Sequence, residues 1–264
     1  MRLAWTAVFL SMLLVMTSTA GAAEHPALAQ ARALHNAADY DAAISAAAVA
    51  RADPAWADAA ALVGARSHLE RYRLRLDPAD LIAAREALTA IHPPALSPRD
   101  YLDLLVGYGQ ALYLGGTFGA AAELFDTALS RSSILSARDR LLLLDWWATA
   151  VDHEAQTLAV DRRVPLLERL NERMEEEVRQ DPGNSVANYW LAASARGAGD
   201  GERAWHAAVA GWIRAILQPE SAGALRADLD RLVTEVLIPE REREEPEAGA
   251  ALLVEWEALK EQWR

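Results

Sequence analysis

The chain has 264 residues, of which 52% are hydrophobic and 24% are charged. This balance is ordinary for a globular protein, too polar for a membrane-embedded helix bundle and too apolar for a disordered chain. A net charge of −12 repels phosphate backbones and argues against a nucleic-acid partner. The absence of cysteine excludes disulfides, cysteine-ligated metals and a lipid on an N-terminal cysteine.

The first 23 residues have the pattern of a secretory signal. Arg2 precedes the apolar run Leu3–Met16, and the small residues of Thr17–Ala23 follow, with Ala20-x-Ala22 as the expected cleavage box. We therefore predict a cleaved signal peptide over residues 1–23 and a mature domain over residues 24–264, in the periplasm or secreted. The same run would also serve as an uncleaved anchor helix. No further segment reaches transmembrane length.

The rest of the chain repeats apolar residues every three to four positions, which predicts helices and no strands. Six helix pairs are expected, near residues 25–36 and 39–52, 55–73 and 78–91, 97–114 and 118–131, 136–157 and 165–180, 185–197 and 201–217, and 221–237 and 247–263.

Capping residues and glycines mark the expected starts and ends of these helices. Asp53, Asp77 and Asp181 each precede a proline, which predicts a carboxylate cap at a helix start. Gly115-Gly116 and Gly199 allow the chain to reverse between helices. The charged stretch Pro239–Glu247 is expected to be a solvated connector into the last helix, and Arg71–Asp77 an extra loop.

One stretch, Leu105–Leu129, places large and small residues at the spacings of a helical hairpin. The positions that carry this pattern are Leu105, Tyr108, Gly109, Leu112, Gly116, Phe118, Ala121, Phe125 and Ala128. The pattern resembles the tetratricopeptide repeat (TPR), a unit of about 34 residues. The first pair resembles it too, with Tyr40 and Ala43 at the large and small packing positions, and so in part does the fifth.

This resemblance implies an all-α, right-handed α-solenoid of about six antiparallel hairpins, a degenerate TPR-like array that fills residues 24–264. Such arrays bind proteins or peptides in a concave groove lined by the first helix of each pair. The family's spacing selects for that groove Arg32, His35, His68, Asp103, Gln110, Tyr113, Asp145, Thr149, Asp152, His153, Tyr189 and Arg196. Tyr113, Asp145, Asp152, Tyr189 and Arg196 are the binding candidates. A merely solvated surface would show the same residue types.

Six aromatic residues gather between positions 146 and 212, namely Trp146, Trp147, Tyr189, Trp190, Trp205 and Trp212. Their helical spacing is typical of a packed core, although one or two of them could reach the groove. The acid–histidine cluster Asp152-His153-Glu154 lacks the second histidine of a zinc protease motif. No phosphate-binding loop or nucleophile elbow occurs in the sequence, so we predict no catalytic residues, no metal and no cofactor.

The sequence thus favours an exported, non-enzymatic scaffold or adaptor that recognises a protein or peptide. It predicts no nucleic-acid partner and no membrane segment after signal cleavage, and leaves a homo-oligomer open. An extracytoplasmic binding protein for a small or hydrophobic ligand, with an aromatic-lined pocket, is the alternative. An enzyme on a helical scaffold would need carboxylates or histidines that converge in the groove.

Overall fold

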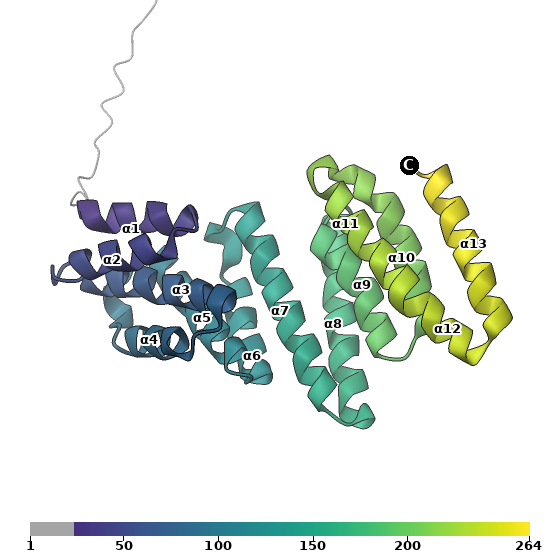
Figure 1. The fold of residues 1–264 in the computed structure, drawn as a ribbon, viewed down its shortest axis with the longest axis horizontal. Coiled ribbons are helices and arrows are strands. Elements are labelled where there is room, and N and C mark those ends of the chain that lie inside the picture. The colour runs from purple at the N-terminus through teal and green to yellow at the C-terminus, as the bar shows by residue number, and fades with distance from the viewer. Residues whose placement is uncertain (1–23) are drawn as a thin grey trace, which may run out of the picture.

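The computed structural model describes residues 24–264, and within this range the chain is helical with no strand (Figure 1). The all-α prediction is therefore confirmed. The predicted signal peptide, residues 1–23, lies outside the described residues.

The helices occur in the order predicted, with differences at their ends. The α-helices are α1 (Pro26–Asn36), α2 (Tyr40–Ala50), α3 (Ala57–Arg75), α4 (Pro78–Thr89), α5 (Pro98–Leu114), α6 (Phe118–Leu129), α7 (Ala137–Thr157), α8 (Val160–Gln180), α9 (Ser185–Gly197), α10 (Gly201–Arg214), α11 (Pro219–Leu232), α12 (Ile238–Glu244) and α13 (Pro246–Gln262). Short 3₁₀ turns follow α4, α6 and α10, at Pro93–Ala95, Ser132–Ile134 and Ala215–Leu217, and a π-helical turn, Val233–Leu237, joins α11 to α12.

Helices that follow one another in the chain pack on one another. Helices α1 to α6 lie toward one end of the long axis, α7 near the middle and α8 to α13 toward the other end (Figure 1). A second set of contacts joins alternate helices. Helix α3 contacts both α1 and α5, and α9 contacts both α7 and α11. First helices of neighbouring expected pairs therefore also contact one another, in the two series α1–α3–α5 and α7–α9–α11.

The tight turns between paired helices share one geometry. Ala38, Gly116 and Gly199 have positive φ angles of 61°, 79° and 88°. In each turn the amide of the following residue donates to the carbonyl oxygen five residues earlier, at 2.9–3.0 Å. This is the Schellman closure of a helix, which needs a left-handed residue and favours glycine. The first turn places alanine where the third and fifth place glycine.

The core lies between the helices of each pair and between neighbouring pairs. Phe125 and Trp147 are fully buried where α5, α6 and α7 meet. A β-carbon at Gly109 of α5 would lie only 2.5 Å from the Phe125 ring, so the two helices approach through this glycine. The small and large positions of the resemblance thus carry close packing, as their residue types predict.

Several expected boundaries are wrong, including the start of α3, whose N-cap is Trp56 rather than the predicted Asp53. Helix α8 begins at Val160 and contains Pro165, because proline fits helical φ and near a helix start costs few backbone hydrogen bonds. Helix α3 continues to Arg75, so only two residues remain of the predicted loop.

The predicted connector Pro239–Glu247 is largely the helix α12. Its surface charges pair within it, because Arg241 lies 3.3 Å from Glu244 and 2.9 Å from Glu245. The cap of α9 also differs from the prediction. Asn184, rather than Asp181, accepts a hydrogen bond from a first-turn amide, that of Ala187.

Candidate functional site

The odd-numbered helices carry a continuous set of polar and aromatic side chains, here called the first-helix face. It is defined by Arg32 and His35 of α1, Arg66 of α3, Arg99, Asp103 and Tyr113 of α5, Arg138, Asp145 and Asp152 of α7, and Tyr189 and Arg196 of α9. Contacts between α1, α3 and α5, and between α7 and α9, bring these residues together across hairpins that are distant in the sequence.

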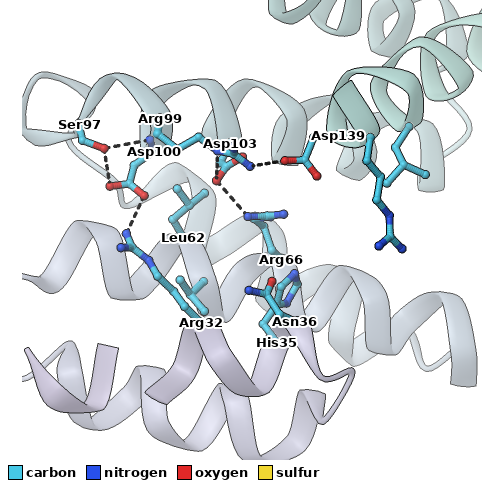
Figure 2. A pocket seen from close by; sticks show the side chains of 13 residues that line it. Arg32, His35, Asn36, Leu62, Arg66, Ser97, Arg99, Asp100, Asp103 and Asp139 are labelled. Atoms are coloured by element: carbon cyan, nitrogen blue, oxygen red, sulfur yellow. Dashed lines mark hydrogen bonds and ion pairs between the residues drawn. The ribbon is translucent and has the colours of Figure 1, made fainter. Parts of the chain in front are cut away.

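The N-terminal part of this face holds a cleft of about 600 Å³ between α1, α3, α5 and α7 (Figure 2). Its volume is in the range of ligand-binding pockets. The side chains that line it are Arg32, His35, Asn36, Leu62, Val63, Arg66, Ser97, Arg99, Asp100, Asp103, Arg138, Asp139 and Leu142.

Ion pairs join the helices around the cleft. Arg32 of α1 donates to Asp100 of α5 at 2.7 Å, and Arg66 of α3 donates to Asp103 of α5 at 3.1 Å (Figure 2). Asp103 also pairs with Arg99 at 3.3 Å. A single carboxylate therefore holds two guanidinium groups in place.

His35 lies at the base of the same cleft and is partly buried. Its Nδ1 is 3.0 Å from the hydroxyl oxygen of the buried Ser67. Burial, with a smaller contribution from the nearby charge of Arg66, lowers the pKa of His35 from 6.5 to about 4. The histidine is therefore neutral at pH 7, and the positive charge of the cleft comes from arginine alone.

Further along the face, Tyr113 lies among aromatic rings. Its hydroxyl is 3.2 Å from Nδ1 of His153, and the two rings stack with centroids 5.4 Å apart. Trp146 meets the Tyr113 ring edge-on at 5.1 Å, and the guanidinium of Arg73 lies over Trp146 at 5.1 Å. Burial raises the pKa of Tyr113 above its ordinary value.

Asp145 and Asp152 lie on α7 two turns apart. Asp145 is exposed but accepts a hydrogen bond from the indole N–H of Trp190 at 2.8 Å. Asp152 accepts from the Gln156 amide at 2.6 Å, and burial raises the pKa of its carboxyl.

Tyr189 and Arg196 complete the face on α9. Burial raises the pKa of Tyr189, and the carboxylates of Asp228, Asp152 and Asp145 add to this rise, while the charge of Arg231 opposes it. Arg196 donates to Glu240 of α12 through both Nε and Nη2, at distances down to 2.5 Å.

Of the five binding candidates, four have a side-chain hydrogen bond within the chain. Tyr113, Asp145, Asp152 and Arg196 are engaged in this way, and Tyr189 packs edge-on against the Trp190 ring.

The cleft itself was only partly foreseen. Arg32, His35 and Asp103 belong to the face that the repeat spacing selects, whereas Arg66, Arg99 and Arg138 do not. These three arginines share one feature that the sequence does contain, because each lies on the expected first helix of its pair, α3, α5 or α7. His68 is held elsewhere, with its Nδ1 2.8 Å from the buried Asp80 of α4.

The tryptophans pack mainly in the core. Trp147, Trp190 and Trp205 are buried, and Trp205 contacts the fully buried Trp256 with ring centroids 5.9 Å apart. None of the tryptophans within residues 24–264 lines the cleft.

Among residues 24–264, no helix is long and apolar enough to span a bilayer. The same residues contain no group of three or more histidine, aspartate or glutamate side chains placed to hold a metal ion. Comparison of the chain with protein-family models, with curated proteins and with solved structures finds no match.

Proposed function

We infer that the chain is an exported, non-enzymatic scaffold or adaptor that binds a protein or peptide along the first-helix face. The TPR-like residues in the third pair, together with the succession of contacts α1–α3–α5 and α7–α9–α11, support a right-handed solenoid of about six hairpins. The N-terminal pattern Arg2, Leu3–Met16 and Ala20-x-Ala22 supports export to the periplasm or beyond.

The observation that carries the proposal is the cleft between four odd-numbered helices. It brings charged groups of both signs and exposed apolar surface together in one place, as binding surfaces do. A small-molecule pocket walled by tryptophan is less well supported, because the tryptophans lie outside the cleft.

Export is tested by fractionating cells of the native host that carry a C-terminally tagged chain. Mass spectrometry of the purified protein then gives its first residue. We expect envelope or secreted protein that begins at Ala23 or Glu24, next to the predicted cleavage box. Full-length chain in the cytosol would contradict the localisation, and uncleaved chain in the envelope would show an anchor.

Partner binding is tested by native mass spectrometry of the same preparation. A stoichiometric polypeptide companion is expected, and its yield should fall when Leu142, which lines the cleft, is changed to serine. The matched control is Val49→Ser on α2, because both side chains are exposed, 54% for Leu142 and 63% for Val49. A small mass adduct without a polypeptide would overturn the adaptor proposal in favour of the small-ligand alternative.

A further inference from the structure

The cleft concentrates positive charge on a chain that is negative overall. Four of its lining residues are arginines and three are aspartates, whereas the whole chain has 26 basic and 38 acidic residues. The lining thus has a formal excess of one positive charge, because His35 is neutral at pH 7.

Two of the four arginines retain unused hydrogen-bond donors. Arg66 donates only one Nη1–H to Asp103, which leaves its Nε and Nη2 groups without a partner among residues 24–264. Arg138 is exposed at the start of α7, and its guanidinium group forms no hydrogen bond or ion pair with any residue of that range. A guanidinium group has five N–H donors in a planar fork that matches a carboxylate.

Apolar surface lies beside these donors. Leu142, one turn after Arg138 on α7, is 54% exposed, whereas Leu62 and Val63 of α3, which also line the cleft, are buried. Exposed leucine next to unpaired arginine matches a ligand that has both carboxylates and an apolar group. A compact dicarboxylate would leave Leu142 in water and gain nothing from it.

We propose that this cleft binds an acidic segment of a protein partner, with carboxylate side chains on Arg66 and Arg138 and a neighbouring apolar side chain on Leu142. The inference rests on the proposed function and adds to it the chemistry of the partner. Repulsion from the acidic remainder of the chain is screened beyond about 8 Å at physiological ionic strength, whereas direct carboxylate–guanidinium pairs persist.

The test is selection of short random peptides on the immobilised mature chain, residues 24–264. We expect enriched sequences that combine glutamate or aspartate with leucine, isoleucine or phenylalanine. The same selection on the double variant Arg66→Gln/Arg138→Gln should lose the acidic preference. The control Arg51→Gln/Arg162→Gln removes the same charge from two exposed positions, one directly after α2 and one on α8, and should keep the acidic preference.

The outcomes separate this inference from the proposed function. Enrichment of peptides without acidic residues, or of acidic peptides that both double variants retain, would overturn the acidic-segment proposal and leave peptide binding intact. No enrichment on any version of the chain would overturn both.

A quantitative check uses one enriched peptide in a fluorescence anisotropy titration. Replacing its acidic residues with glutamine, or using the single variant Arg138→Gln, should weaken binding about tenfold, since each removes a charge-assisted contact. Arg138 has no partner to lose within residues 24–264, so this variant is expected to keep its fold, which circular dichroism checks. Succinate is titrated in parallel, and displacement of the peptide by succinate at an equal concentration would show a small-carboxylate site instead.

Discussion

His35 should make the stability of this chain depend on pH between about 6.5 and 4, a range in which most carboxyl groups of the chain are still ionised. In the folded chain the pKa of His35 is about 4, against 6.5 without its surroundings, because burial and the charge of Arg66 disfavour the imidazolium. Below pH 6.5 the unfolded chain therefore binds a proton at His35 that the folded chain does not bind until the pH approaches 4. Stability contributed by the neutral histidine is complete above pH 6.5 and is lost as the pH falls toward 4.

The size of the effect follows from the two pKa values. At pH 5 the unfolded histidine is almost fully protonated and the folded one almost fully neutral. The linkage relation gives a loss of about 2 kcal/mol between pH 7 and pH 5 for this residue. That is a large part of the net stability of a typical domain, about 5–15 kcal/mol.

The assay is urea unfolding at pH 7 and pH 5, followed by circular dichroism at 222 nm. Between pH 7 and pH 5 the free energy of unfolding should fall by about 2 kcal/mol more for the wild-type chain than for the His35→Gln variant, which has no titrating group at this position. Each protein is compared with itself at the two pH values, so any loss of packing in the variant cancels. His206→Gln, at an exposed position on α10, should behave like wild type. Equal losses in wild type and His35→Gln would refute the reasoning.

Three further predictions concern the fold and use the urea midpoint at pH 7. Ala38→Gly should stabilise by about 0.5–1 kcal/mol, because φ is 61° and a left-handed alanine is strained; a lower midpoint would contradict this. Gly109→Ala should destabilise by about 1–3 kcal/mol, because its β-carbon would meet the Phe125 ring at 2.5 Å, and an unchanged midpoint would show that the helices can separate freely. Asp80→Asn should cost about 1.5–3 kcal/mol, because the buried carboxylate accepts from both Nε and Nη2 of Arg71; wild-type stability would mean that the pair contributes no net energy.

Features governed by local rules could be predicted from the sequence. Gly116 and Gly199 take the left-handed positions that close their helices, and Phe125 fills the space beside Gly109. The errors also have local causes. Pro165 indicated a helix start but is tolerated within α8, and the alternating charges of Arg241 and its neighbours stabilise a helix where a connector was expected.

The cleft depends on relations that one sequence does not contain. Arg32 and Asp100 are 68 residues apart, and their ion pair requires the relative placement of α1 and α5. Arg66 and Arg138 are not among the groove residues that the repeat spacing selects, because nothing in their local sequence shows that α3 and α7 line the same space. The partner of Asp145, the indole of Trp190, likewise depends on how α7 packs against α9.

The division between core and first-helix face also decides how binding can be studied. The apolar core lies between paired helices, around side chains such as Phe125 and Trp147, and contributes most of the stability. The ion pairs of the cleft, such as those of Arg32 and Arg99, are partly exposed, and pairs of this kind contribute about 0–1 kcal/mol each. Substitutions of the charged residues in the cleft should therefore leave the fold almost unchanged, and under the proposed function a loss of binding there can be assigned to lost contacts with the partner.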